Sequence, residues 1–63
     1  MISAMTSLMD EIAVASHMIE RYGAGAAALM EARARDNRAA GEHEAAVFWA
    51  QVAQAVRALQ RQT

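Results

Sequence analysis

The residues best suited to metal chemistry are two histidines and the carboxylates close to them. His17 and Glu20 stand three positions apart, so a helix would place them on adjacent turns, and Glu42, His43 and Glu44 follow one another further along. Carboxylate-bridged metal centres in helical bundles use Glu-x-x-His with both side chains facing inward. Here the order is reversed and His17 falls on the polar face of its segment. The sequence therefore predicts solvated histidines, with no metal site and no cofactor.

Nucleophilic catalysis has equally little support. Serine, threonine and histidine side chains are present, but neither a nucleophile elbow nor a phosphate-binding loop occurs. The chain contains no cysteine, which removes thiolate catalysis, disulfides and Cys-based zinc sites together. A chain of 63 residues also has little interior from which to form a substrate pocket. We therefore predict no catalytic residue and a protein that is not an enzyme.

Three arginines gather late in the second predicted helix, at Arg33, Arg35 and Arg38. A basic helix followed by another helix suggests a nucleic-acid contact, because a helix-turn-helix has this order of elements. Glu31 and Asp36 interleave with the arginines, however, and the formal net charge is -1. Attraction to phosphates needs a net positive face. A small nucleic-acid-associated transcriptional regulator is therefore the alternative function, and nucleic acid is not the expected partner.

Two glycines divide the chain into helical segments. Gly23 and Gly41 each follow a run of helix-forming residues, where a glycine that ends a helix is expected. No proline interrupts the segments between them. We predict helices over Thr6–Tyr22, Gly25–Ala40 and Glu42–Gln60. Residues 1–63 would then form a single helical domain, an all-α three-helix bundle with antiparallel neighbours.

The apolar residues recur at helical spacing, most clearly in the first and third segments. The first segment has a stripe at Met5, Leu8, Ile12, Ser16 and Ile19. The third has a broad face at Ala45, Phe48, Trp49, Val52, Val56 and Leu59, whereas the second has only Leu29 and Met30 as large apolar residues. The first and third segments are therefore expected to supply most of the core. The residues predicted to form the core or an interface are Leu8, Ile12, Ile19, Phe48, Trp49, Val52, Val56 and Leu59.

Several side chains have more than one possible role. Arg33 falls near the inner arc of its helix, where it could pair with a carboxylate, grip a partner or extend its charged head to water, the commonest outcome. Glu31 and Arg35 have the spacing of an ion pair along one helix. Phe48 and Trp49 are adjacent and point about 100° apart on a helix. Either both fill the core, or one packs within the chain and the other in an interface.

The small size of the chain favours association. A chain of 6.8 kDa buries roughly 60% of its unfolded surface, or about 5,900 Å². If ~60% of that area is apolar, burial contributes about 90 kcal/mol at about 25 cal/mol per Å². Ordering the chain costs about 95 kcal/mol at about 1.5 kcal/mol per residue. A single copy would be marginal, so we predict a homo-oligomer.

The sequence also bears on location. No stretch approaches the ~20 apolar residues needed to span a bilayer. The segment from Met1 to Ile12 has no basic start and carries Asp10 and Glu11 where a signal peptide would be apolar. We therefore expect a cytoplasmic protein with no membrane partner.

Three short motifs carry a resemblance. They are Ile19-Glu20-Arg21-Tyr22-Gly23, then Gly41-Glu42, then Trp49-x-x-Val52. With these the chain resembles, from Met18 to Leu59, a group of uncharacterised alphaproteobacterial helical proteins of about sixty residues. The resemblance implies a helical fold and a bacterial origin, and it implies no activity.

Taken together, these features predict a non-enzymatic helical module for protein–protein interaction or assembly. Its expected partner is a second copy, as a homodimer, or another helical protein, and its mechanism is the burial of an apolar stripe against a second helical surface.

Overall fold

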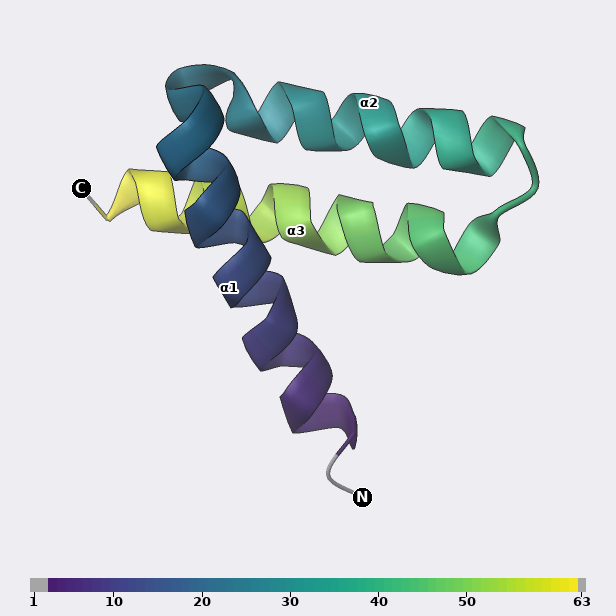
Figure 1. Ribbon diagram of the computed structural model, residues 1–63, viewed down its shortest axis with the longest axis horizontal. Coiled ribbons are helices and arrows are strands. Elements are labelled where there is room, and N and C mark those ends of the chain that lie inside the picture. The colour runs from purple at the N-terminus through teal and green to yellow at the C-terminus, as the bar shows by residue number, and fades with distance from the viewer. Residues whose placement is uncertain (1–2, 63) are drawn as a thin grey trace.

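A computed structural model describes residues 3–62 of the chain, with side chains from Asp10 to Gln62. Helix α1 spans Ser3–Tyr22, α2 spans Ala26–Ala39 and α3 spans His43–Arg61, and the short turn η1 (Gly23–Gly25) joins α1 to α2 (Figure 1). No strand occurs in this part of the chain. The all-α prediction is therefore confirmed. The predicted helix ends differ most at the start of α1, which begins at Ser3 rather than Thr6.

The prediction of three separate helices needs a correction. Within residues 3–62, α1, η1 and α2 follow one another with no loop residue from Ser3 to Ala39, so the helices join into two runs, of which α3 is the second. Gly23 turns the chain with a φ of 58°, and the amide of Ala26 then donates to the carbonyl of Gly23, so helical geometry resumes at once. The amide of Gln60 in α3 also donates to this carbonyl, with Nε2 2.9 Å from the oxygen.

The helices form a hairpin and a crossing arm rather than a regular bundle. Helices α2 and α3 lie side by side and antiparallel (Figure 1). Helix α1 crosses the C-terminal half of α3, and its N-terminal half continues beyond the hairpin, away from α2 (Figure 1). The second predicted helix therefore takes a full part in the packing, while half of the first extends past it.

The turn between α2 and α3 is a Schellman motif centred on Gly41. Gly41 has a φ of 81°, and its amide donates to the carbonyl of Arg38 at 3.1 Å. The amide of Glu42 donates to the carbonyl of Asn37 at 2.8 Å, and the Asn37 side chain donates to Oε1 of Glu42 at 2.7 Å. These bonds satisfy carbonyls that a helix end leaves unpaired. The sequence prediction that Gly41 ends a helix is therefore confirmed.

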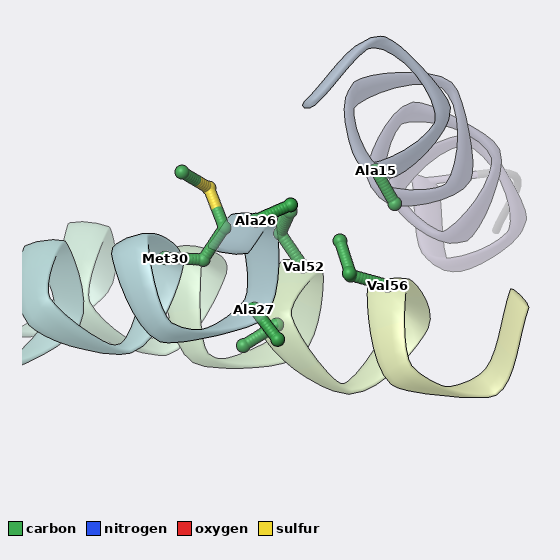
Figure 2. Packing of buried hydrophobic residues seen from close by; sticks show 7 residues of the cluster. Ala15, Ala26, Ala27, Met30, Val52 and Val56 are labelled. Carbon is green, nitrogen blue, oxygen red and sulfur yellow. The ribbon is translucent and has the colours of Figure 1, made fainter. Parts of the chain in front are cut away.

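The core consists mainly of small side chains between α2 and α3. Met30, Val52 and Val56 are the largest side chains that are fully buried. From α1, Ala15 belongs to this cluster and points toward Val56 (Figure 2). The other members are Ala26, Ala27 and Ala53. Helix α2 thus supplies as many members of this cluster as α3, because its alanines let the two helices approach closely, so the second helix contributes more to the core than the sequence indicated.

The face that α1 turns toward α3 is not the stripe predicted from its period. Glu11 and Ala15 are buried, whereas Ile12 and Ser16 are exposed and Ile19 is half-buried. Adjacent helix positions lie about 100° apart, so the contact face and the stripe differ by about one residue in rotation. The crossing places the small side chain of Ala15 against α3 and leaves Ile12, about one turn earlier, exposed. The apolar stripe thus lies along one flank of the contact.

The molecule has an open shape for its mass. Its accessible surface is 4490 Å², whereas a compact monomer of 6.8 kDa exposes about 4,000 Å². The radius of gyration is 11.6 Å, against about 10.6 Å for a compact domain of this length. The shortest extent is only 16 Å. Much of each helix is therefore covered on one side only.

Candidate interaction surface

An open groove of about 550 Å³ lies between α1 and the C-terminal half of α3. Glu11 lines it from α1, and the α3 residues that line it are Gln51, Gln54, Ala55, Arg57, Ala58 and Arg61. One carboxylate, two guanidinium groups and two amides therefore border the groove, with alanine methyl groups among them. The groove offers both a hydrogen-bond acceptor and several donors to whatever enters it.

Glu11 is the most unusual residue of the groove. It is only 8% exposed, and it is the one buried charged residue among the described side chains. No ion pair or hydrogen bond of its carboxylate occurs among these residues. Nor is any fully enclosed side-chain oxygen or nitrogen left without a partner, so the Glu11 oxygens reach the opening of the groove. Loss of the remaining contact with water would be costly for a carboxylate without a partner, and the pattern of residues in the sequence did not single out Glu11.

The two arginines of the groove have different surroundings. Arg57 forms an ion pair with Glu31 of α2 across the hairpin. The hydrogen bond from Arg57 lowers the pKa of Glu31 below its ordinary value, and the same bond raises the pKa of Arg57. The pair replaces the Glu31–Arg35 contact predicted along one helix. Arg61, in the last turn of α3, is exposed and forms no ion pair with the residues described.

An exposed apolar residue adjoins the groove. Ile12, next to Glu11 in α1, is 43% exposed, and Ile19 is half-buried two turns later. We call Met5, Leu8, Ile12, Ser16 and Ile19 the α1 stripe. The side chains of Leu8 and Met5 lie outside the described residues. Val47 of α3 is also exposed, at 55%, but it does not belong to the stripe.

The remaining predicted core residues are all in α3, and they differ in depth. Val52 and Val56 are fully buried, whereas Phe48, Trp49 and Leu59 are half-buried against the core cluster. The rings of Phe48 and Trp49 meet edge to face, with centroids 5.1 Å apart. Neither ring therefore fills the centre of the core alone.

The three arginines of α2 do not act as one patch. All three are exposed, but the Arg33 guanidinium lies 5.2 Å from the centroid of the Trp49 ring. Arg33 thus lays its stem along the hairpin and stacks its charged end on an aromatic face. Helices α2 and α3 lie antiparallel (Figure 1), whereas the helices of a helix-turn-helix cross at about 90–120°.

The candidate metal ligands do not converge. His17 and Glu20 are exposed on α1, and Glu42, His43 and Glu44 are exposed at the start of α3. Helix α1 crosses the other end of α3 (Figure 1). Within the described part of the chain, no group of three or more His, Asp or Glu side chains could hold a metal ion.

Two further findings bear on function. None of the described helices is long and apolar enough to cross a membrane. Comparisons of the chain with protein-family models, curated protein sequences and solved structures found no match. The resemblance to short alphaproteobacterial proteins therefore stays a prediction.

Proposed function

We propose that the chain is a non-enzymatic assembly module that binds a second copy of itself through α1. The observation that carries this proposal is the exposure of Ile12, 43%, on a helix whose N-terminal half extends beyond the hairpin (Figure 1). An amphipathic helix gains free energy when another helix covers its apolar face. We expect this association to take place in a bacterial cytoplasm, in keeping with the sequence resemblance.

The exposed area supports a partner of protein size. The accessible surface of 4490 Å² exceeds that of a compact monomer of this mass by about 500 Å². A standard interface covers about 800 Å² on each partner. The excess is therefore of the same order as the area that association would bury.

The composition of the α1 stripe favours a second copy over a charged partner. None of its five residues, Met5, Leu8, Ile12, Ser16 and Ile19, carries a charge. Two such stripes can face each other without opposing like charges, which would otherwise weaken the contact. A small residue, Ser16, lies between Ile12 and Ile19 and leaves room for a crossing helix.

Sedimentation equilibrium of the whole chain tests the proposal. The expected mass is twice the 6.8 kDa of one chain. Ile12→Glu places a charge in the stripe and should reduce the mass to that of one chain. The matched control is Val47→Glu, which makes the same change at an even more exposed position and should leave the mass doubled.

A wild-type chain that stays at the mass of one copy at every concentration would overturn the proposal. The alternative prediction, contact with nucleic acid through Arg33, Arg35 and Arg38, gives a different result. It requires a labelled duplex to be retarded at low salt and released at high salt.

A further inference from the structure

Glu11 holds its carboxylate at the edge of the groove, where the described residues provide no cation that pairs with it. Glu11 is 8% exposed, and no described residue pairs with it. Two arginines, Arg57 and Arg61, line the same groove. Arg57 is already paired with Glu31. Arg61 is exposed and forms no ion pair with the described residues.

We propose that Glu11 accepts the guanidinium of the partner's Arg61 when two copies associate about a two-fold axis. This inference rests on the proposed self-association and adds to it a polar contact and an orientation. In a two-fold dimer each contact occurs twice, so an interface must be complementary to itself. A groove that holds at its edges an acid and a base without partners among the described residues meets this requirement.

The proposed pair of Glu11 with the partner's Arg61 would lie beside the α1 stripe. Glu11 and Ile12 are adjacent, so a helix that covers Ile12 also borders the groove. Closing the groove would remove the Glu11 carboxylate from water, and a buried carboxylate is stabilised by a directly bonded guanidinium. The apolar contact thus supplies burial, while two Glu11–Arg61 pairs select one orientation of the two copies.

Charge reversal in separate chains tests the pairing between copies. Alone, Glu11→Arg would bring arginine against arginine, and Arg61→Glu would bring glutamate against glutamate. Each variant should raise the dimer dissociation constant by at least about tenfold. An equimolar mixture of the two variants should form a heterodimer, because the two substituted side chains then attract each other on one side of the axis and the native pair is kept on the other. Pairing within one chain predicts no such recovery.

Arg35→Glu serves as the matched control, because it reverses an exposed arginine outside the groove. It should leave the dissociation constant within about twofold of the wild-type value. Circular dichroism checks that each variant keeps its helix content. If Glu11→Arg loses helix, then Glu11→Gln, Arg61→Gln and the double variant replace it in a double-mutant cycle. A coupling between the two sites of less than about twofold in that cycle would overturn the inference.

The possible failures are distinguishable. A wild-type dimer that neither charge reversal weakens contradicts the Glu11–Arg61 pair and leaves the proposed self-association standing. Weakened single variants whose mixture stays monomeric contradict pairing between copies. A wild-type chain that is monomeric at every concentration contradicts both proposals.

Discussion

Gly41 shows how much of the hairpin depends on the backbone of one residue. Its φ of 81° allows the amides of Gly41 and Glu42 to bond back to the end of α2. An L-residue at this φ is strained because its Cβ approaches its own backbone. No neighbouring residue adds to that strain, since nothing lies within 4 Å of where a Cβ would stand. The turn therefore requires glycine for conformation and not for space.

Gly41→Ala should lower the free energy of unfolding by about 1–2 kcal/mol, the cost of holding an L-residue in the left-handed region. The measurement is urea denaturation followed by circular dichroism. Gly25→Ala is the control, because Gly25 has a φ of -86° and equally open surroundings. It should be neutral or stabilise by about 0.4–1 kcal/mol. Equal losses in the two variants would contradict the role of φ.

The Glu31–Arg57 pair gives the hairpin a dependence on pH. Its hydrogen bond lowers the pKa of Glu31 below the ordinary value of 4.5. A carboxylate with a lowered folded-state pKa contributes stability above its unfolded pKa and loses that contribution as pH falls through the folded value. Glu31→Gln should therefore be slightly less stable than the wild type at pH 7, and the difference should vanish as the pH falls through the folded-state pKa of Glu31.

Thermal unfolding across this pH range measures the difference. The effect should be small and should shrink in high salt, because both partners of the pair are exposed. Glu20→Gln removes an exposed carboxylate that forms no ion pair within the described residues, and it should show no such trend. A difference that does not shrink as the pH falls would exclude the ion pair as its cause.

At the scale of helices, the sequence predicted where each helix begins and ends better than it predicted which face of a helix contacts its neighbours. The end of α2 and the start of α3 could be predicted from Gly41 and its neighbours, because helix capping depends on residues next to one another in the chain. The contact face of α1 did not follow, because hydrophobic period favours Ile12 while a close crossing favours the smaller Ala15. Glu11 and the partner of Glu31 were missed for a related reason, since each depends on a helix distant in sequence.

Because the residues between α2 and α3 are small, a larger side chain placed there should destabilise the hairpin. Ala53 is 1% exposed in the core cluster, so Ala53→Leu should force the helices apart and cost about 1–3 kcal/mol. Val47→Leu introduces the same side chain at an exposed position of α3 outside the groove and should change stability by less than about 0.5 kcal/mol. Chemical denaturation of both variants measures this. An Ala53→Leu variant as stable as the wild type would show that α2 and α3 are not closely packed at Ala53.

At the scale of the whole molecule, the thin and open shape makes the stability of the fold depend on other molecules that bind to it. The shortest extent is 16 Å, and the N-terminal half of α1 continues beyond the α2–α3 hairpin (Figure 1). Anything that binds the folded chain and not the unfolded one raises its apparent stability. A self-associating chain should therefore become more stable as its own concentration rises.

The melting temperature should increase by about 3–6 °C for each tenfold rise in protein concentration, since tenfold in concentration corresponds to about 0.7 kcal/mol per chain. Calorimetry at several concentrations measures this slope. Ile12→Glu should melt at a temperature independent of concentration, and Val47→Glu should keep the wild-type slope. A flat wild-type profile would contradict self-association.

The stacking of Arg33 on Trp49 has a practical consequence. Trp49 is the single tryptophan of the chain, and its ring packs in the hairpin under a guanidinium. Its emission should therefore change when α2 separates from α3, and stay nearly constant when two copies part at α1. A fluorescence titration and a mass measurement on the same sample would thus report unfolding and dissociation as separate events.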